Sequence, residues 1–301
     1  MGSNAAELHH IFTEVDTVHL SIIVPAHNEE RGIGSVLDEL TAVANMLDIE
    51  TEIIVVDDGS TDATATEVEA RTVRLVRHEE NRGYGAALKT GVRAAKGDSI
   101  LITDADGTYP IDRISELLEC AEDADMVVGA RTGKNVHIPL LRRPAKYLIS
   151  VLANYLSGTT IPDLNSGLRI FRKAIAERFV DILPSGFSFT TTITLAMICN
   201  SYEVRFVPIP YHQRTGKSKI RPIRDTLNFV QLIVRTVMYF NPLKIFLPLS
   251  VALFAASAGV LAYSYLMTPQ VMDVTTMILF VSGVHMIGIG LIADLIDKRS
   301  R

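Results

Sequence analysis

The chain has 301 residues and a formal net charge of −5 at pH 7. That length suits one large α/β domain with an additional segment, and the acidic balance argues against a general nucleic-acid-binding protein, so we expect no nucleic-acid partner. The two cysteines, Cys120 and Cys199, lie in apolar stretches and indicate buried thiols in a reducing compartment, not a disulfide or metal framework. Residues 1–17 are polar, lack the apolar run of a signal peptide and are expected to form an N-terminal tail.

Short apolar runs alternate with helical patterns over residues 18–221, which we expect to form one domain. Strands are expected at 20–24, 52–56, 73–76, 99–103, 126–128, 168–172 and 203–211. Helices are expected at 33–47, 63–71, 112–120 and 190–199, and after the glycine-containing turn at 81–91. Apolar, β-branched runs are typical of strands buried on both faces, and their alternation with helices predicts an α/β fold with a mostly parallel sheet.

Polar side chains follow four of the first five of these strands. They are Asn28 and Glu29, Asp57 and Asp58, Asp104 and Asp106, and Arg131. In open α/β sheets, ligands bind beyond the carboxyl ends of the strands. A single acidic turn would carry little information, but its repetition along one edge predicts a ligand site there.

The two carboxylates of Asp104 and Asp106 stand at spacing i, i+2 directly after an apolar run. This spacing at a strand end lets both address one ion, and hard oxygen ligands suit Mg²⁺ or Mn²⁺. The motif Asp-x-Asp by itself also occurs in acidic turns. The prediction therefore depends on its position at a strand end, beside the other polar strand ends. The glycine spacing within residues 81–91 is not the dinucleotide fingerprint and predicts no nicotinamide site.

The chain changes character after residue 221. Over 222–242, apolar residues recur at helical spacing with charged residues between them, which predicts an amphipathic helix on a core or a membrane surface. Residues 243–301 contain two apolar runs, about 245–267 and 274–296, each long enough to span a membrane. Basic residues flank the outer ends of both runs, so we expect an integral membrane protein with its large domain on the cytoplasmic face.

Both runs contain small residues that would let two spans pack closely. These are Ala255, Gly259, Gly283, Gly288 and Gly290. His285 lies in the middle of the second run, where an ionisable side chain is by default a functional candidate. Here we favour a neutral histidine that is hydrogen-bonded within the hairpin or within an oligomer. Two spans leave little intramembrane surface to pack, so we expect a homo-oligomer.

Taken together in chain order, these motifs resemble those of family 2 glycosyltransferases. Within that family they are similar to the polyprenyl-phosphate glycosyltransferase group, which includes dolichol-phosphate mannose synthase. The resemblance runs from residue 20 to residue 219 and rests on segments 23–29, 55–62, 81–91, 104–106, 128–131, 166–167 and 214–219. The two C-terminal spans resemble those of bacterial and archaeal members that carry their own membrane anchor. The resemblance implies a Rossmann-like GT-A fold and inverting transfer of a sugar from a UDP- or GDP-linked donor to a dolichyl or undecaprenyl phosphate, with Mg²⁺ or Mn²⁺ as the cofactor.

By position, the resemblance assigns residues to the donor, the metal and the acceptor. The donor would lie against Pro25, His27, Glu29, Asp57, Asp58, Lys89, Asp104, Ala105 and Asp106. Asp104 and Asp106 would bind the metal and act in catalysis. Asp163 is not assigned by the resemblance, but it lies near the proposed acceptor region and is expected to orient the acceptor in catalysis. The acceptor phosphate would be held by Arg131, Arg142, Lys146, Arg214, Lys217 and Lys219. Guanidinium and ammonium groups both suit phosphate.

The chain departs from the family pattern at several places. His27 stands where the family usually has Tyr, Thr108 where mannose synthases often have Gln, and residues 190–192 are threonines where acidic residues are common. Mannose specificity and a third side-chain metal ligand are therefore not carried over. Two alternatives stay open: transfer to another membrane acceptor, such as a glycolipid or a growing glycan, and a non-enzymatic membrane scaffold with a relict domain. The intact acidic motifs argue against a non-enzymatic scaffold with a relict domain.

Overall fold

A computed structural model of the chain describes residues 20–132, 151–155, 157–186, 188–211, 222–267 and 273–300. The chain divides into two compact units. The first consists of Met1–His137, Asn165–Thr190 and Glu203–Ser218, and the second of Ile138–Leu164, Thr191–Tyr202 and Lys219–Arg301. The expected tail lies outside the described residues, and the domain limits 18–221, 222–242 and 243–301 stay a prediction.

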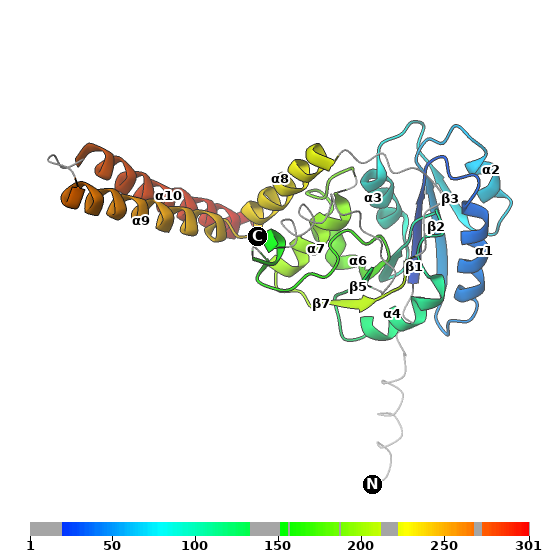
Figure 1. The fold of residues 1–301 in the computed structure, drawn as a ribbon. Coiled ribbons are helices and arrows are strands. Elements are labelled where there is room, and N and C mark those ends of the chain that lie inside the picture. The colour runs from blue at the N-terminus through cyan, green and yellow to red at the C-terminus, as the bar shows by residue number, and fades with distance from the viewer. Residues whose placement is uncertain are drawn as a thin grey trace, which may run out of the picture. The chain divides into compact units, whose positions relative to one another are not determined.

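The first unit is built on a seven-stranded sheet of order β3-β2-β1-β4-β6-β5-β7 (Figure 1). The strands are β1 Leu20–Ala26, β2 Thr51–Asp57, β3 Arg74–Arg77, β4 Ser99–Ile102, β5 Met126–Ala130, β6 Arg169–Arg172 and β7 Val204–Pro208. Four neighbouring pairs are parallel, while β6 runs antiparallel to both β4 and β5. The predicted mostly parallel sheet is thus confirmed, with one reversed strand inside it.

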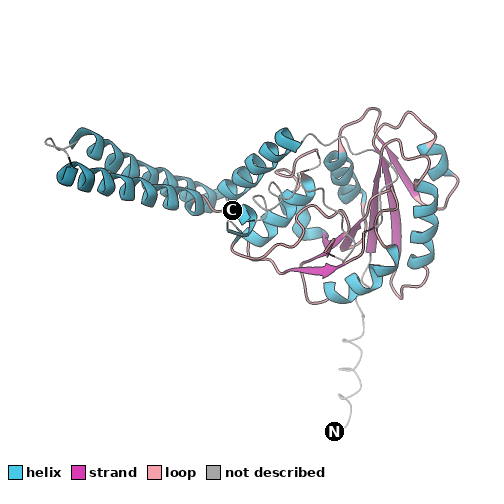
Figure 2. Ribbon diagram, viewed as in Figure 1, coloured by secondary structure: helices cyan, strands magenta, loops and turns pink. Residues whose placement is uncertain are grey.

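Helices cover both faces of this sheet (Figure 2). They are α1 Ile33–Ala44, α2 Thr64–Glu69, α3 Tyr84–Ala94, the 3-10 turn η1 Ile111–Arg113, α4 Ile114–Ala121 and α6 Lys173–Phe179, which the sequence pattern did not predict. Side chains alternate along β1, as they must in a strand. Ile22 and Val24 join the core cluster that contains Leu37 of α1, whereas Ile23 packs against Gly91 of α3 on the other face.

The register of the strands brings the polar strand ends together. Ala26 pairs with Asp57 and Ile23 with Ile102, so β1, β2 and β4 end at the same edge. The reversed strand β6 begins at this edge, because Arg169 pairs with Ile102. The segment just before β6 therefore meets the ends of its neighbours.

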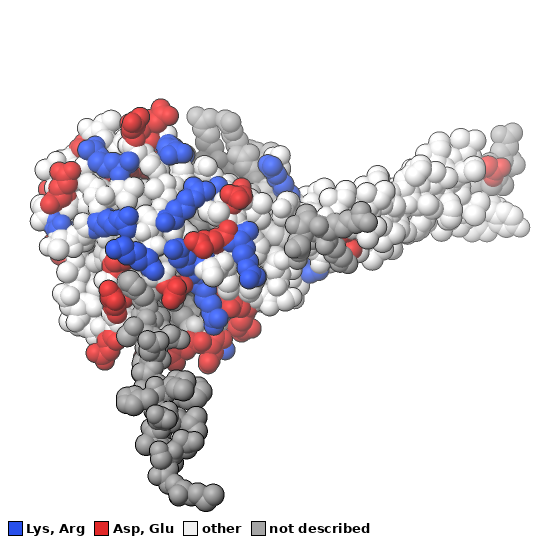
Figure 3. Space-filling view, turned by 180° about the vertical axis from the view of Figure 1, so that it is seen from behind, with Lys and Arg blue, Asp and Glu red and all other residues white. Residues whose placement is uncertain are grey.

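The second unit contains the long C-terminal helices α8 Pro222–Phe240, α9 Leu243–Met267 and α10 Asp273–Ser300, and helix α7 Phe189–Cys199 joins the two units in sequence. By length and composition, residues 243–267 and 273–296 are each apolar enough to cross a membrane. Figure 3 shows this paired-helix segment almost devoid of charged atoms along its length, in contrast to the mixed charges of the globular part. The two predicted spans are therefore present as a helical hairpin.

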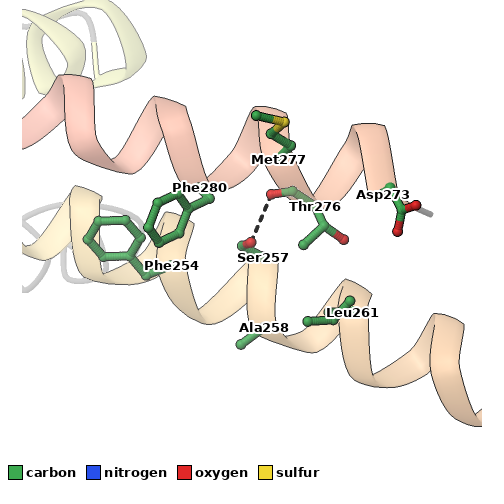
Figure 4. A pocket seen from close by; sticks show the side chains of 8 residues that line it. All are labelled: Phe254, Ser257, Ala258, Leu261, Asp273, Thr276, Met277 and Phe280. Carbon is green, nitrogen blue, oxygen red and sulfur yellow. Dashed lines mark hydrogen bonds between the residues drawn. The ribbon is translucent and has the colours of Figure 1, made fainter. Parts of the chain in front are cut away.

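Helices α9 and α10 pack through small residues. The hydroxyl of Ser250 donates to the carbonyl of Gly283 at 2.8 Å, and that of Ser257 donates to the carbonyl of Thr276 at 2.8 Å (Figure 4). The donors and the acceptors are each seven residues apart, which is the repeat of a left-handed helix pair. A Cβ on Gly283 would lie 2.7 Å from a ring atom of Phe254, so glycine permits the close approach.

Other small residues of the hairpin face outward. Gly259 and Gly288 have nothing within 4 Å of the position where a Cβ would lie, so they do not contribute to this contact. His285 is also exposed on the surface of α10. An apolar groove of about 510 Å³ lies beside the Ser257 contact and is lined in part by Phe254 and Phe280 (Figure 4).

The two cysteines form no disulfide in the described structure. Both thiols are partly buried, less than expected, and Cys120 packs against the core cluster.

Candidate active site

The loops after β1 and β2 are joined by hydrogen bonds at the edge of the sheet. Asn28, whose φ is 56°, accepts from the backbone N–H of Thr61 at 2.9 Å, and its own N–H donates to Ser60 at 3.0 Å. The N–H of Glu29 donates to Thr64 at 2.9 Å. These contacts join two motifs more than thirty residues apart into one rim. Asn tolerates this left-handed backbone better than most residues.

His27 has a defined tautomer within this rim. Its Nδ1 lies 2.9 Å from the carbonyl oxygen of Asp58 and so donates the proton, which leaves Nε2 as the acceptor 3.2 Å from the side-chain amide of Asn28. The His27 side chain is exposed, Glu29 is partly exposed, and Pro25 is buried within β1. Of the three residues expected at the nucleoside, His27 is therefore the most accessible.

The two neighbouring aspartates at the end of β2 are held inside the protein. Asp57 is fully buried, accepts from the backbone N–H of Ser60 at 3.0 Å and pairs with Arg77 at 3.1 Å. Asp58, 3% exposed, accepts from the ring of His78 at 2.7 Å and from the backbone N–H groups of Arg82 and Gly83. These contacts tie the β2 end to the chain between β3 and α3.

The environment of Asp58 favours its charged form. Burial raises the pKa of this carboxyl, but hydrogen bonds from His78 and from the backbone of Arg82 and Gly83 outweigh burial and bring the pKa below its ordinary value. His78 in turn contacts the hydroxyl of Thr90 on α3 at 2.9 Å. Asp58 thus stabilises the loop that leads into α3.

Asp104 lies at the centre of a cluster drawn from three segments. The phenol of Tyr84 donates to its Oδ1 at 2.9 Å. A Cβ on Gly167 would lie 2.9 Å from both carboxylate oxygens, so the absence of a side chain there lets the start of β6 approach the carboxylate. The N–H of Gly167 donates to the hydroxyl of Tyr109 at 2.6 Å. Burial and the charge of Asp104 raise the pKa of Tyr109 above its ordinary value, so this phenol stays neutral.

Asp106 is positioned by its own turn. Its Oδ1 accepts from the backbone N–H of Thr108 at 3.1 Å and from the Thr108 hydroxyl at 2.6 Å, and Gly107 between them has a φ of 68°. Within the described residues, no group of three or more His, Cys, Asp or Glu side chains is placed to hold a metal ion. The two carboxylates of Asp104 and Asp106 fit an oxygen-bound Mg²⁺ or Mn²⁺ whose other ligands come from phosphate and water.

Arg131 lies over an aromatic pair at the end of β5. Its guanidinium carbon is 5.2 Å from the centre of the Tyr211 ring, and this ring meets Tyr109 edge-on at 5.6 Å between centres. Stacking on an aromatic face is a favourable placement for a guanidinium. Because Tyr109 also binds Gly167, a continuous series of contacts leads from Arg131 to the surroundings of Asp104.

Arg169 is a residue of this region that we did not single out from the sequence. It is fully buried, and its guanidinium donates to the carbonyls of Ser166 and Thr190. Its positive charge acts to lower the pKa of Tyr84, against the larger effects of burial and Asp104. The sequence signal that could have identified it is a charged residue between Leu168 and Ile170, inside an apolar strand.

Lys89 lies on α3 and is partly buried. Burial and the positive charge of Arg93 lower the pKa of Lys89, and Asp181 partly opposes them. Ala105 is buried between the two aspartates of its motif. Asp163 belongs to the second unit, and its role stays a prediction. Five predicted phosphate ligands, Arg142, Lys146, Arg214, Lys217 and Lys219, lie outside the described residues.

Comparisons with known proteins agree with this architecture. The family model described as Glycosyl transferase family 2 matches residues 21–180, and the model described as GtrB C-terminal hairpin matches residues 241–298. The dolichyl-phosphate hexose transferase of Haloferax volcanii is 32% identical over 228 residues, which are 75% of this chain and 97% of that protein. The undecaprenyl-phosphate 4-deoxy-4-formamido-L-arabinose transferase of Pseudomonas fluorescens is 32% identical and covers 80% of this chain and 71% of its own length.

Solved structures support the fold. Glucosyl-3-phosphoglycerate synthase from Mycobacterium tuberculosis, crystallised with Mn²⁺, uridine diphosphate and phosphoglyceric acid, superposes with a TM-score of 0.59 at 20% identity. The match covers 74% of this chain and 79% of that one. At this identity the likeness is one of fold, and it agrees with the GT-A architecture expected from the sequence.

Proposed function

Because the chain belongs to glycosyl transferase family 2 and ends in a GtrB-type hairpin, we propose that it transfers a sugar from a nucleotide-sugar donor to a polyprenyl phosphate. The product is a monosaccharide linked to a lipid phosphate. The observation that carries this proposal is the Asp104–Asp106 pair, held at the carboxyl edge of the sheet in a chain that also has a membrane-length hairpin. The names of the relatives, which act on dolichyl or undecaprenyl phosphate, support the choice of acceptor.

In this proposal the diphosphate of a UDP- or GDP-linked sugar lies at the Asp104–Asp106 pair. These two carboxylates would hold a Mg²⁺ or Mn²⁺ ion, and such an ion would supply neutralisation of the charge on the departing diphosphate. His27, Glu29 and the rim formed by the two joined loops lie on the nucleoside side of the donor. Preorganised groups of this kind stabilise the transition state without rearranging during the reaction.

The acceptor needs little chemical activation. A phosphate monoester has a second pKa near about 6, so it is already an anionic nucleophile at neutral pH. The remaining task is to place it in line with the leaving group, which inverts the anomeric centre. Arg131, stacked on Tyr211, is the described cation that suits the acceptor phosphate, and the basic residues assigned by resemblance would complete its binding site.

The proposal also places the protein in the membrane. In the proposal, hairpin α9–α10 is the anchor and the catalytic domain lies on the cytoplasmic side. The basic outer flanks of the two apolar helices support this orientation. The outward-facing His285 and Gly288 favour packing of α10 against a second copy of the chain, since a polar ring facing hydrocarbon is costly. We therefore propose a homo-oligomer.

The experiment that tests this function uses washed membranes that contain the full-length protein. A panel of radiolabelled UDP- and GDP-sugars is supplied with undecaprenyl or dolichyl phosphate, and the lipid product is extracted. We expect one donor to give a lipid-soluble product that mild acid releases, as a glycosyl phosphate does. A product that resists mild acid, or one that forms equally without added polyprenyl phosphate, would contradict the proposed acceptor.

A further inference from the structure

The phenol of Tyr84 links two elements of the candidate active site. Tyr84 is the first residue of α3, and its hydroxyl donates to Oδ1 of Asp104, which follows β4, at 2.9 Å. In this contact the phenol O–H is the donor and the carboxylate oxygen is the acceptor, because an ionised carboxylate can only accept.

The backbone that carries Tyr84 is fixed on its N-terminal side by Asp58. This carboxylate accepts from the backbone N–H of Arg82 at 2.9 Å and of Gly83 at 2.8 Å. Gly83 has a φ of 99°, a conformation that side chains rarely adopt, and a Cβ there would lie 2.6 Å from the carbonyl of Ser185. The turn into α3 is thus fixed by contacts on two sides.

The C-terminal side of Tyr84 is equally restricted. Gly85 packs directly against the carbonyl of Pro184, with no room for a side chain, and the N–H of Ala86 donates to Ser185 at 3.0 Å. The Tyr84 hydroxyl therefore reaches Asp104 from a backbone that has little freedom to move. A donor fixed in this way restricts the orientation of the carboxylate that it binds.

We propose that Tyr84 is a positioning residue that orients Asp104 for the metal ion, and that Asp58 acts on the same carboxylate indirectly, by fixing the loop before Tyr84. This inference rests on the proposed function, because it takes Asp104 to be a metal ligand. Residues that hydrogen-bond to metal ligands commonly change metal affinity or activity by about 10–100-fold when they are removed. Tyr84 itself donates to Asp104 and is not a ligand in this proposal.

The test compares Tyr84→Phe with the wild-type protein, both full-length in detergent. The substitution removes one oxygen atom and keeps the ring. Mn²⁺ is titrated in the presence of UDP and, separately, of GDP, and free Mn²⁺ is measured by electron paramagnetic resonance. We expect Tyr84→Phe to bind Mn²⁺ about 10–100-fold more weakly, with a melting temperature in metal-free buffer equal to that of the wild type. Tyr155→Phe removes the phenol of a tyrosine that is 59% exposed in the second unit, and it should bind Mn²⁺ normally.

Asp104→Asn separates this inference from the proposed function. If Asp104→Asn binds Mn²⁺ like the wild type with both nucleotides, the proposed metal site is wrong. If Asp104→Asn loses Mn²⁺ but Tyr84→Phe keeps wild-type affinity, only the role of Tyr84 is overturned. Tyr84→Phe could also have a lower melting temperature than the wild type in metal-free buffer, with weaker Mn²⁺ binding that this loss of stability explains. That result would give the hydroxyl a purely structural role and would also overturn the inference.

Discussion

Gly167 approaches Asp104 so closely that a Cβ on the glycine would lie 2.9 Å from both oxygens of the carboxylate. The two residues come from segments more than sixty positions apart in sequence, and they meet because β6 begins at the edge where β4 ends. The contact leaves no space for any side chain at position 167.

Gly167→Ala should therefore displace the Asp104 carboxylate and lower activity. We expect a loss of about tenfold or more, since misplacing a catalytic group by about 1 Å can cost 10²-fold. Gly186→Ala is the matched control, because nothing lies within 4 Å of its Cβ position. Sugar transfer to polyprenyl phosphate measures both variants, and equal activity of the two would show that the close approach at Gly167 is unimportant.

Asp104→Asn and Asp106→Asn should each reduce turnover by about 10²-fold or more, since one well-placed charge-stabilising group is worth several kcal/mol. Turnover of the wild type should also fall to background in EDTA and return with Mg²⁺ or Mn²⁺. Circular dichroism checks that both variants are folded. Full activity in EDTA, in the wild type or in either variant, would refute a metal-dependent reaction.

Arg131→Ala should raise the concentration of polyprenyl phosphate needed for half-maximal rate, by about tenfold or more, because a charge-assisted contact to the phosphate is lost. The KM for the nucleotide sugar should change far less. Arg172→Ala, which removes a half-exposed arginine that pairs with Asp125 on the same sheet, serves as the control. If Arg131→Ala weakens donor binding but leaves the polyprenyl phosphate concentration for half-maximal rate unchanged, Arg131 binds the donor diphosphate instead of the acceptor phosphate.

Asp58→Asn should destabilise the first unit at pH 7, because backbone donors of Arg82 and Gly83 lose a charged acceptor, at a cost of about 1–3 kcal/mol. The folded-state pKa of Asp58 lies below its unfolded value, so its stabilisation is complete above the unfolded pKa and is lost as pH falls through the folded pKa. The melting temperatures of variant and wild type should thus differ most near neutrality and converge in acid. Asp123→Asn, at a side chain that is 82% exposed, should show no such difference.

The orientation of the hairpin can be tested with single cysteines placed in a protein from which Cys120 and Cys199 have been removed. Asp273→Cys, at the start of α10, should react with a membrane-impermeant thiol reagent added outside intact cells. Ser300→Cys, at the other end of this helix, should react only after the cells are opened. The reverse pattern would place the catalytic domain on the other side of the membrane.

The sequence alone determined the general plan of the protein. Apolar runs of strand length, each followed by a helical pattern, determine a mostly parallel sheet, and parallel strands necessarily end at one edge. The acidic groups after β1, β2 and β4 can therefore be assigned to one site from the pattern of strands and helices. The hairpin was equally predictable, because two uncharged runs of more than about 18 residues have few alternatives to a membrane span.

Only the tertiary structure decided what each acid does within that site. Asp57 and Asp58 stand at the end of a strand just as Asp104 does, yet the first two are buried against Arg77 and His78. The phenol of Tyr84, the missing side chain of Gly167 and the buried Arg169 leave no periodic signal. Groups that they contact, such as Asp104 and the carbonyl of Thr190, belong to distant segments of the chain. They meet where the reversed strand β6 is inserted between β4 and β5, and local periodicity cannot encode that choice of neighbours, since it depends on packing between distant segments of the chain.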